Sequence, residues 1–293
     1  MSIAYGAIGT NQLIHRYPSC RVFRLVGLSI LATMSIMQAA EFQDPEDITF
    51  NATVDGSVQK YVRMMPKPAV KGGPTAALIC LHGAGSDRWQ YVKEERGECR
   101  GARDVAARHG MMFISPDYRA SASWMGPTAE ADLKQIITEL RVKRGVTRIF
   151  LAGASMGGTG SLIFTALHPE LIDGVYSANG MGNMVTYDNF AESIALSYGG
   201  SKKDQPDEYR KRSAELFPER FTMPIAITVG GKDEVVPPMS VLRLGAALTK
   251  AKRRVLVINR ETTGHVTDYD DTVQALEFML KAAADSPVKK GKK

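Results

Sequence analysis

Three residues far apart in the sequence, Ser155, Asp233 and His265, have the side chains that nucleophilic catalysis needs. A serine hydroxyl is a weak nucleophile alone, and it needs a base within hydrogen-bond reach to take its proton. A histidine can act as that base, and a carboxylate can hold the imidazole in the correct tautomer. The three residues therefore predict acyl transfer at a serine, provided that the fold brings them together.

The residues around Ser155 predict how its hydroxyl is presented. Gly153-Ala154-Ser155-Met156-Gly157 follows the apolar run 149–152 and precedes a segment compatible with a helix, 159–168. A strand, a sharp Gly-x-Ser-x-Gly turn and a helix would project the hydroxyl above a sheet, at a positive helix N-terminus. The same pattern also occurs in glycine-rich turns with an incidental serine, so the partners of Ser155 must decide.

The histidine is identified partly by elimination. His265 ends the turn Thr262-Thr263-Gly264-His265, between a predicted strand, 254–258, and a predicted helix, 269–284. The others lie in the N-terminal segment, at two helix ends and at a strand end suited to shaping a loop: His15, His109, His168 and His82. A solvated loop residue is the alternative interpretation of His265.

The carboxylate has more competitors. Asp233 lies in Gly231-Lys232-Asp233-Glu234-Val235-Val236-Pro237, directly after the predicted strand 224–229. The competing acids are Glu234, Asp268, Asp270 and Asp271. The last three precede or open the helix predicted over 269–284, where acidic side chains complement the helix dipole. Asp233 is therefore the predicted acid.

The segments that position these residues alternate between strand-like and helix-like patterns. The predicted strands are 75–81, 111–115, 149–152, 172–178, 224–229 and 254–258, and the helices are 101–109, 128–144, 159–168, 240–251 and 269–284. This alternation predicts an α/β fold with a mostly parallel central sheet and helices on both faces. Runs at 48–54 and 58–65 around Asp55-Gly56 predict an antiparallel N-terminal hairpin. The polar stretch 191–218 is expected to add one or two helices over the site.

We expect the parallel sheet to bring the three residues close together. Ser155, Asp233 and His265 each follow a predicted strand, and functional groups of parallel sheets gather at the carboxyl ends of the strands. The order Ser…Asp…His, with the turn at Ser155, resembles serine hydrolases of the α/β-hydrolase fold over about 75–280. Within that fold the chain is similar to compact secreted esterases of the polyhydroxybutyrate depolymerase and feruloyl esterase type. It also resembles the catalytic domain of prolyl-oligopeptidase-type enzymes.

The resemblance also implies an oxyanion site. His82-Gly83-Ala84-Gly85 follows the strand 75–81 and resembles a His-Gly-Gly-Gly oxyanion loop with alanine at one position. The backbone N–H groups of Ala84 and Met156 are the implied donors. A plain glycine-rich turn is the alternative. No metal motif and no phosphate-binding glycine loop follows a strand, so we expect neither metal nor cofactor.

Three aromatic residues lie in loops after strand ends, Trp89, Tyr118 and Trp124. They are candidates for lining the substrate pocket, and packing is the equal alternative. Cys80 and Cys99 could form a disulfide, although the position of Cys80 within an apolar strand favours a buried thiol.

The favoured activity is hydrolysis of small or polymer-linked carboxylic esters. A small peptidase is the alternative, and a non-catalytic or acyl-transferring protein of this fold is a third. Only about seven residues separate Ala40 from the strand at Ile48, which leaves no room for a peptide-anchoring propeller. Glu94-Glu95 is the one acidic pair that could hold a peptide amino terminus. Acyl and alcohol preferences are not predicted, because loop shape sets them.

The ends of the chain account for its basic charge. Of 293 residues, 44% are hydrophobic and 23% charged, an ordinary globular composition with a formal charge of +6. Three arginines in 1–40 and four lysines in 289–293 supply that excess, so no nucleic-acid partner is expected. We predict a signal peptide over 1–40, a hydrolase domain over 41–284 and a basic disordered tail over 285–293. The expected protein is exported and has no stable membrane span; a retained membrane anchor is the alternative.

Overall fold

The computed structural model describes residues 41–285. The predicted signal peptide or anchor, 1–40, lies outside the described residues, and so does the tail from 286 onward. Export, the membrane anchor and the disordered tail therefore stay predictions. Within the described range, no helix is long and apolar enough to cross a membrane.

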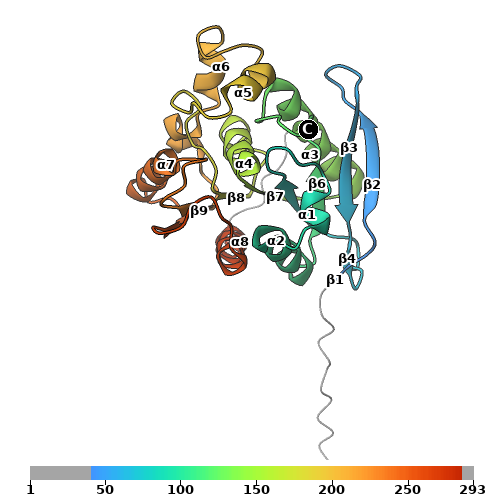
Figure 1. The fold of residues 1–293 in the computed structure, drawn as a ribbon. Coiled ribbons are helices and arrows are strands. Elements are labelled where there is room, and N and C mark those ends of the chain that lie inside the picture. Colours follow the sequence, from blue (N-terminus) through green and yellow to red (C-terminus); the bar gives the residue numbers. More distant parts are fainter. Residues whose placement is uncertain (1–40, 286–293) are drawn as a thin grey trace, which may run out of the picture. The chain divides into compact units, whose positions relative to one another are not determined.

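An eight-stranded sheet forms the centre of the described domain (Figure 1). Its strand order is β10-β9-β8-β7-β5-β6-β3-β2. The pairs β2–β3 and β3–β6 are antiparallel, and all pairs from β6 to β10 in this order are parallel. These strands are β2 (Glu46–Asn51), β3 (Val58–Met64), β5 (Ala76–Leu81), β6 (Met112–Pro116), β7 (Arg148–Ala154), β8 (Gly174–Ala178), β9 (Ile225–Gly230) and β10 (Val255–Arg260). Two short strands, β1 (Glu41–Phe42) and β4 (Pro66–Lys67), pair separately. The predicted fold class is confirmed.

Helices pack on both faces of the sheet, which is why the inner strands are apolar throughout. On β5, Ile79 faces a core shared with α3, α4 and α7, while Cys80 faces a second core shared with α2 and α8. The helices are α1 (Gln90–Lys93), α2 (Gly97–Arg108), α3 (Pro127–Arg144), α4 (Met156–Leu167), α5 (Ala191–Tyr198), α6 (Pro206–Lys211), α7 (Met239–Lys250) and α8 (Tyr269–Ala284). Two 3₁₀ turns, Ala214–Leu216 and Pro218–Arg220, follow α6.

Several predicted bounds were wrong by a few residues. The strand predicted to reach 54 ends at Asn51, because Ala52 N–H donates to Ser57 O at 2.8 Å and closes a longer turn around Asp55-Gly56. Helix α2 begins at Gly97 rather than 101, and α1 was not predicted. Helix α4 begins directly after Ser155, although Met-Gly-Gly is a weak helix-forming sequence. Tertiary packing overrides local propensity at these starts.

A buried ion-pair network fastens the segment between β8 and β9 to the core. Arg212 follows α6, is fully buried in its side chain, and pairs with Glu130 of α3 and Glu208 of α6, each at 2.7 Å. Glu130 also contacts His168 at the end of α4 at 2.8 Å. Burial raises the pKa of Glu130, but its bonds with His168 and Arg212 outweigh burial and hold that pKa at about 2.

We expect Glu130→Gln to lower the free energy of unfolding by about 2–3 kcal/mol at pH 7, because it leaves the buried Arg212 partly unpaired. The folded pKa of Glu130, about 2, lies below its ordinary value of 4.5. The contribution of ionised Glu130 to the free energy of unfolding is therefore complete above about pH 4.5 and is lost as the pH falls toward 2. Denaturant unfolding of both proteins across this pH range checks the prediction.

The matched control is Glu139→Gln on the same helix. Glu139 pairs with Lys143 at 3.4 Å, and that lysine is 66% exposed, so the change should cost less than about 0.5 kcal/mol. Equal losses of stability in the two variants would contradict a special role for the Glu130 network.

Candidate active site

Ser155 stands at a sharp turn between β7 and α4. Its φ of 57° and ψ of −121° lie in a region that L-residues rarely adopt. The turn closes because glycines flank it: a Cβ on Gly153 would overlap the backbone of Gly157, and one on Gly157 would overlap the carbonyl of Leu81. Ser155 N–H donates to Ala178 O of β8 at 2.8 Å, which ties the turn to the sheet. The pattern thus forms the strand, turn and helix predicted for it.

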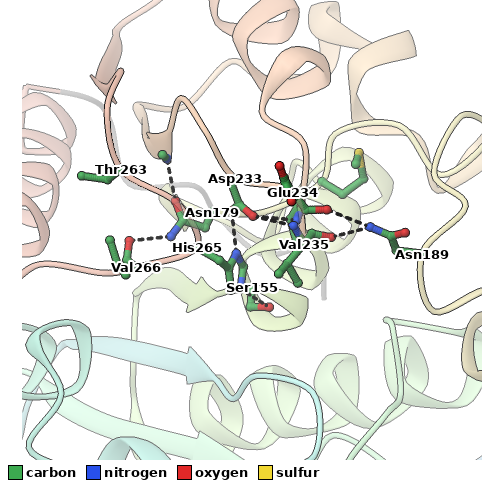
Figure 2. Close-up of polar contacts among 12 residues, drawn as sticks. Ser155, Asn179, Asn189, Asp233, Glu234, Val235, Thr263, His265 and Val266 are labelled. Atoms are coloured by element: carbon green, nitrogen blue, oxygen red, sulfur yellow. Dashed lines mark hydrogen bonds and ion pairs between the residues drawn. The ribbon is translucent and has the colours of Figure 1, made fainter.

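The structure brings Ser155, His265 and Asp233 together (Figure 2). Ser155 Oγ lies 3.0 Å from His265 Nε2, and His265 Nδ1 lies 2.6 Å from Asp233 Oδ2. Because the carboxylate can only accept, Nδ1 carries the proton and the Nε2 lone pair faces the serine hydroxyl. The arrangement can therefore move the serine proton to the imidazole.

The loop after β9 holds the carboxylate in place. Asp233 is 4% exposed, and its Oδ1 accepts the backbone N–H groups of Val235 at 2.9 Å and Val236 at 2.8 Å. These bonds leave Oδ2 directed at His265. Two of the four competing acids act elsewhere: Asp268 caps α8 by accepting from Asp271 N–H at 3.0 Å, and Asp271 pairs with Arg260.

The loop after β5 lies beside the nucleophile. A Cβ on Gly83 would come within 3.9 Å of Ser155 Cβ. Gly83 N–H donates to Gln90 Oε1 at 2.9 Å and Gly85 N–H to Ser121 O at 2.7 Å, so the middle N–H, that of Ala84, is the candidate donor. Met156 is the first residue of α4, where backbone N–H groups have no acceptor within the helix. Their roles as oxyanion donors stay predictions.

Two of the three candidate pocket aromatics are buried, which favours the packing alternative for them. Trp124 is 0% exposed, donates to Ser193 Oγ at 2.9 Å and packs against Tyr187 and Phe190. Tyr118 is 2% exposed and donates to His82 O at 2.6 Å. Both rings belong to the hydrophobic core on this face of the sheet.

His82 begins and Trp89 ends the segment between β5 and α1, which contains the predicted oxyanion donor Ala84. Trp89 is half-buried, and Lys93 Nζ lies 4.0 Å from its ring centroid. His82 is fully buried, its ring centroid lies 4.6 Å from that of Tyr118 in a tilted arrangement, and burial lowers its pKa. His82 therefore shapes the loop, as predicted. His168 ends α4, about 18 Å along the helix from Ser155, and is no candidate base.

Sequence reasoning missed the polar side chains that hold the catalytic loops. Asn179, at the end of β8, bonds to Gly230 and Val266. Asn189 Nδ2 contacts Val235 O at 2.9 Å, and Tyr187 donates to the same carbonyl at 2.9 Å. Asn179 follows the carboxyl end of a parallel strand, a position that could have marked it; the other two lie in an irregular segment with no such signal.

The arrangement of ligating side chains and cysteines can be stated for the described part of the chain. Residues 41–285 contain no group of three His, Cys, Asp or Glu side chains placed to hold a metal ion. Cys80 and Cys99 are buried free thiols, so the structure contains no disulfide between them.

Comparison with known proteins identifies the family. The model of the prolyl oligopeptidase family, Peptidase_S9, matches residues 104–284, which include all three residues of the site. The chain belongs to the prolyl oligopeptidase family. It is thus a serine hydrolase, and the resemblance to this family and to the α/β-hydrolase fold is confirmed. None of the curated protein sequences matches the chain.

Solved structures agree on the fold. The acylaminoacyl peptidase of Pyrococcus horikoshii is similar with a TM-score of 0.62 and 15% identity over 86% of this chain and 43% of that one. A ferulic acid esterase has a TM-score of 0.62 and 18% identity over 83% of this chain and 98% of that one. The fluorophosphonate-binding serine hydrolase F of Staphylococcus aureus has a TM-score of 0.61 and 15% identity over 84% of this chain and 100% of that one. The chain spans less than half the length of the peptidases it matches.

Proposed function

We propose that this serine hydrolase cleaves carboxylic esters through an acyl-enzyme intermediate on Ser155. The observation that carries the proposal is the chain of two contacts, Ser155 Oγ to His265 Nε2 at 3.0 Å and His265 Nδ1 to Asp233 Oδ2 at 2.6 Å. This geometry meets the distance requirement for a nucleophile, its base and the residue that orients the base.

In the first half-reaction, Ser155 Oγ attacks the ester carbonyl carbon while His265 Nε2 takes the hydroxyl proton. The carbonyl oxygen becomes an oxyanion, and the N–H groups of Ala84 and Met156 are the proposed donors that stabilise it. When the tetrahedral intermediate collapses, the bond to the alcohol oxygen breaks and the proton on Nε2 passes to that oxygen. The alcohol leaves, and the acyl group stays on Ser155.

The second half-reaction repeats these steps with water. His265 removes a proton from water, the hydroxyl attacks the acyl carbon, and collapse returns the proton to Ser155 Oγ with release of the acid. Asp233 stabilises the imidazolium in both halves. Its Oδ1 accepts the N–H groups of Val235 and Val236, which leaves Oδ2 to face His265.

Exposed apolar side chains beside the catalytic loops support an ester with an apolar acyl or alcohol group. Val266, next to His265, is 61% exposed, and Val235, two residues after Asp233, is 41% exposed. Phe190 is 44% exposed and packs on Tyr187, whose hydroxyl bonds to Val235 O. Exposed apolar side chains next to catalytic residues offer contacts to an apolar part of a substrate.

The acidic pair that favoured a peptidase already has cationic partners. Glu94 contacts Arg96 Nε at 2.6 Å, and Glu95 contacts Arg103 at 2.7 Å. A peptide amino terminus would have to compete with these guanidinium groups. The similarity to a ferulic acid esterase along almost its whole length also favours ester cleavage.

A small serine peptidase is the second candidate function. The family model and the likeness to an acylaminoacyl peptidase favour it. Both activities use the same acyl-enzyme route, so the triad alone does not discriminate. They differ in the leaving group, because an amine departs far less readily than an alkoxide.

The deciding experiment measures kcat/KM for matched acetyl esters and dipeptide amides. We expect the ester to be hydrolysed at least about a hundredfold faster, and Glu94→Gln and Glu95→Gln to leave this rate unchanged, since neither carboxylate takes part in the proposed reaction. Preferential turnover of the amides, abolished in either glutamine variant, would establish the peptidase instead.

A further inference from the structure

Asn179 occupies the point where β8 ends, between the strand that carries Ser155 and the strand that leads to Asp233. Its side chain is buried, with the whole residue 3% exposed, and its backbone N–H donates to Thr228 O of β9 at 2.8 Å. Nothing in the proposed chemistry so far uses it.

The carboxamide of Asn179 joins two loops. Its Oδ1 accepts the N–H of Gly230 at 3.1 Å, and its Nδ2 donates to the carbonyl of Val266 at 2.6 Å (Figure 2). An N–H can only donate and a carbonyl can only accept, so these partners fix the orientation of the amide. Both of its hydrogen-bonding ends are therefore committed.

The two loops are those of the acid and the base. Gly230 ends β9, and its carbonyl accepts Asp233 N–H at 3.2 Å; Val266 directly follows His265. The loops also meet backbone to backbone, since Lys232 N–H donates to Thr263 O at 2.9 Å and a Cβ on Gly230 would overlap Gly264 O. The Asn179 amide bridges these two loops.

The backbone at this position restricts which side chains can make such a bridge. Asn179 has a φ of 45°, in the left-handed region that asparagine, aspartate and glycine adopt more readily than other residues. Of these three, only asparagine presents one donor and one acceptor on a short planar group. The conformation and the double bond thus point to the same residue type.

We propose that Asn179 is a positioning residue that sets the placement of His265 against Asp233 and Ser155 through this single amide. The inference rests on the proposed triad. A base held at 3.0 Å from the nucleophile is sensitive to small shifts of its loop, and a misplacement of about 1 Å can reduce a rate about a hundredfold. Because the amide is buried and bonded at both ends, its loss is expected to act on kcat rather than on KM.

The test uses Asn179→Asp and Asn179→Gly in the full-length protein. Aspartate keeps the acceptor for Gly230 but turns a second oxygen toward the Val266 carbonyl, while glycine keeps the backbone conformation and removes both bonds. We expect kcat for an acetyl ester to fall about 10- to 100-fold in both variants, with KM within twofold of wild type. The rate of fluorophosphonate labelling at Ser155 should fall in parallel.

The control is Asn183→Ala, on the same segment. Asn183 is also buried, at 7% exposed, and its Nδ2 donates to Glu215 at 2.9 Å, away from the triad. We expect it to lower the melting temperature without changing kcat. If wild type is labelled at Ser155 but the Asn179 variants retain wild-type kcat, or match Asn183→Ala in both readouts, the inference about Asn179 is wrong and the proposed function stands. If wild type is not acylated at Ser155, both the proposed function and this inference are wrong.

Discussion

Replacing Ser155 with alanine should abolish fluorophosphonate labelling and reduce kcat for an acetyl ester by about a million-fold, the loss typical of removing a serine nucleophile. The variant lacks the hydroxyl that lies 3.0 Å from His265 Nε2 and would carry the acyl group, so no acyl-enzyme is expected to form. Mass spectrometry of the intact protein after exposure to the probe measures the adduct directly.

Ser161→Ala is the matched control. Ser161 lies on the same helix, α4, and its fully buried hydroxyl donates to Gly157 O at 2.8 Å rather than to a catalytic group. This variant should be labelled as wild type is. An adduct of equal yield on the Ser155→Ala protein would refute the assignment of the nucleophile.

The second large effect is expected at the base. His265→Ala should lower both kcat and the labelling rate by about 10⁴-fold or more, because the serine hydroxyl loses the acceptor for its proton. The unfolding transition should change little, since His265 is only half-buried and, within residues 41–285, its ring bonds to Ser155 and Asp233 alone. A time course of fluorophosphonate labelling and thermal unfolding followed by circular dichroism, on the same samples, separate reactivity from stability.

Two other histidines provide the comparison. His109→Ala removes an exposed contact to Glu277, and His168→Ala removes a contact to Glu130 at the far end of α4. Both variants should be labelled at the wild-type rate, although the second should be less stable. A folded but unlabelled His168→Ala protein would show that the base was wrongly chosen.

Much of the fold and the site could be predicted because the signals are local. The inner strands of a parallel sheet are covered on both faces, so they appear as short apolar runs, and β5, β7 and β9 were found this way. The turn at Ser155 requires glycine wherever backbone meets backbone, which leaves a readable pattern at Gly153 and Gly157. Residues that follow parallel strands meet at one edge of the sheet, so the grouping of Ser155, Asp233 and His265 could also be predicted.

Other features depended on contacts between distant segments. Helix α2 starts at Gly97 because that glycine packs against the backbone at Asp268 and Tyr269, residues about 170 positions away that no local pattern reveals. Trp124 looked equally suited to a pocket and to the core, and only the packing of Tyr187 and Phe190 over it decided for the core.

The sequence by itself determined which chemical groups the chain has and at which strand ends they lie. Apolar strand patterns, glycine positions and residue order are local features that can be recognised from neighbouring residues. The tertiary structure alone decided how the catalytic loops are held. The bond from Asn179 to Val266 spans 87 residues, and the bond from His265 to Ser155 spans 110. Such bonds form between segments that only the packed sheet brings within 3 Å, so their partners leave no mark in either segment alone.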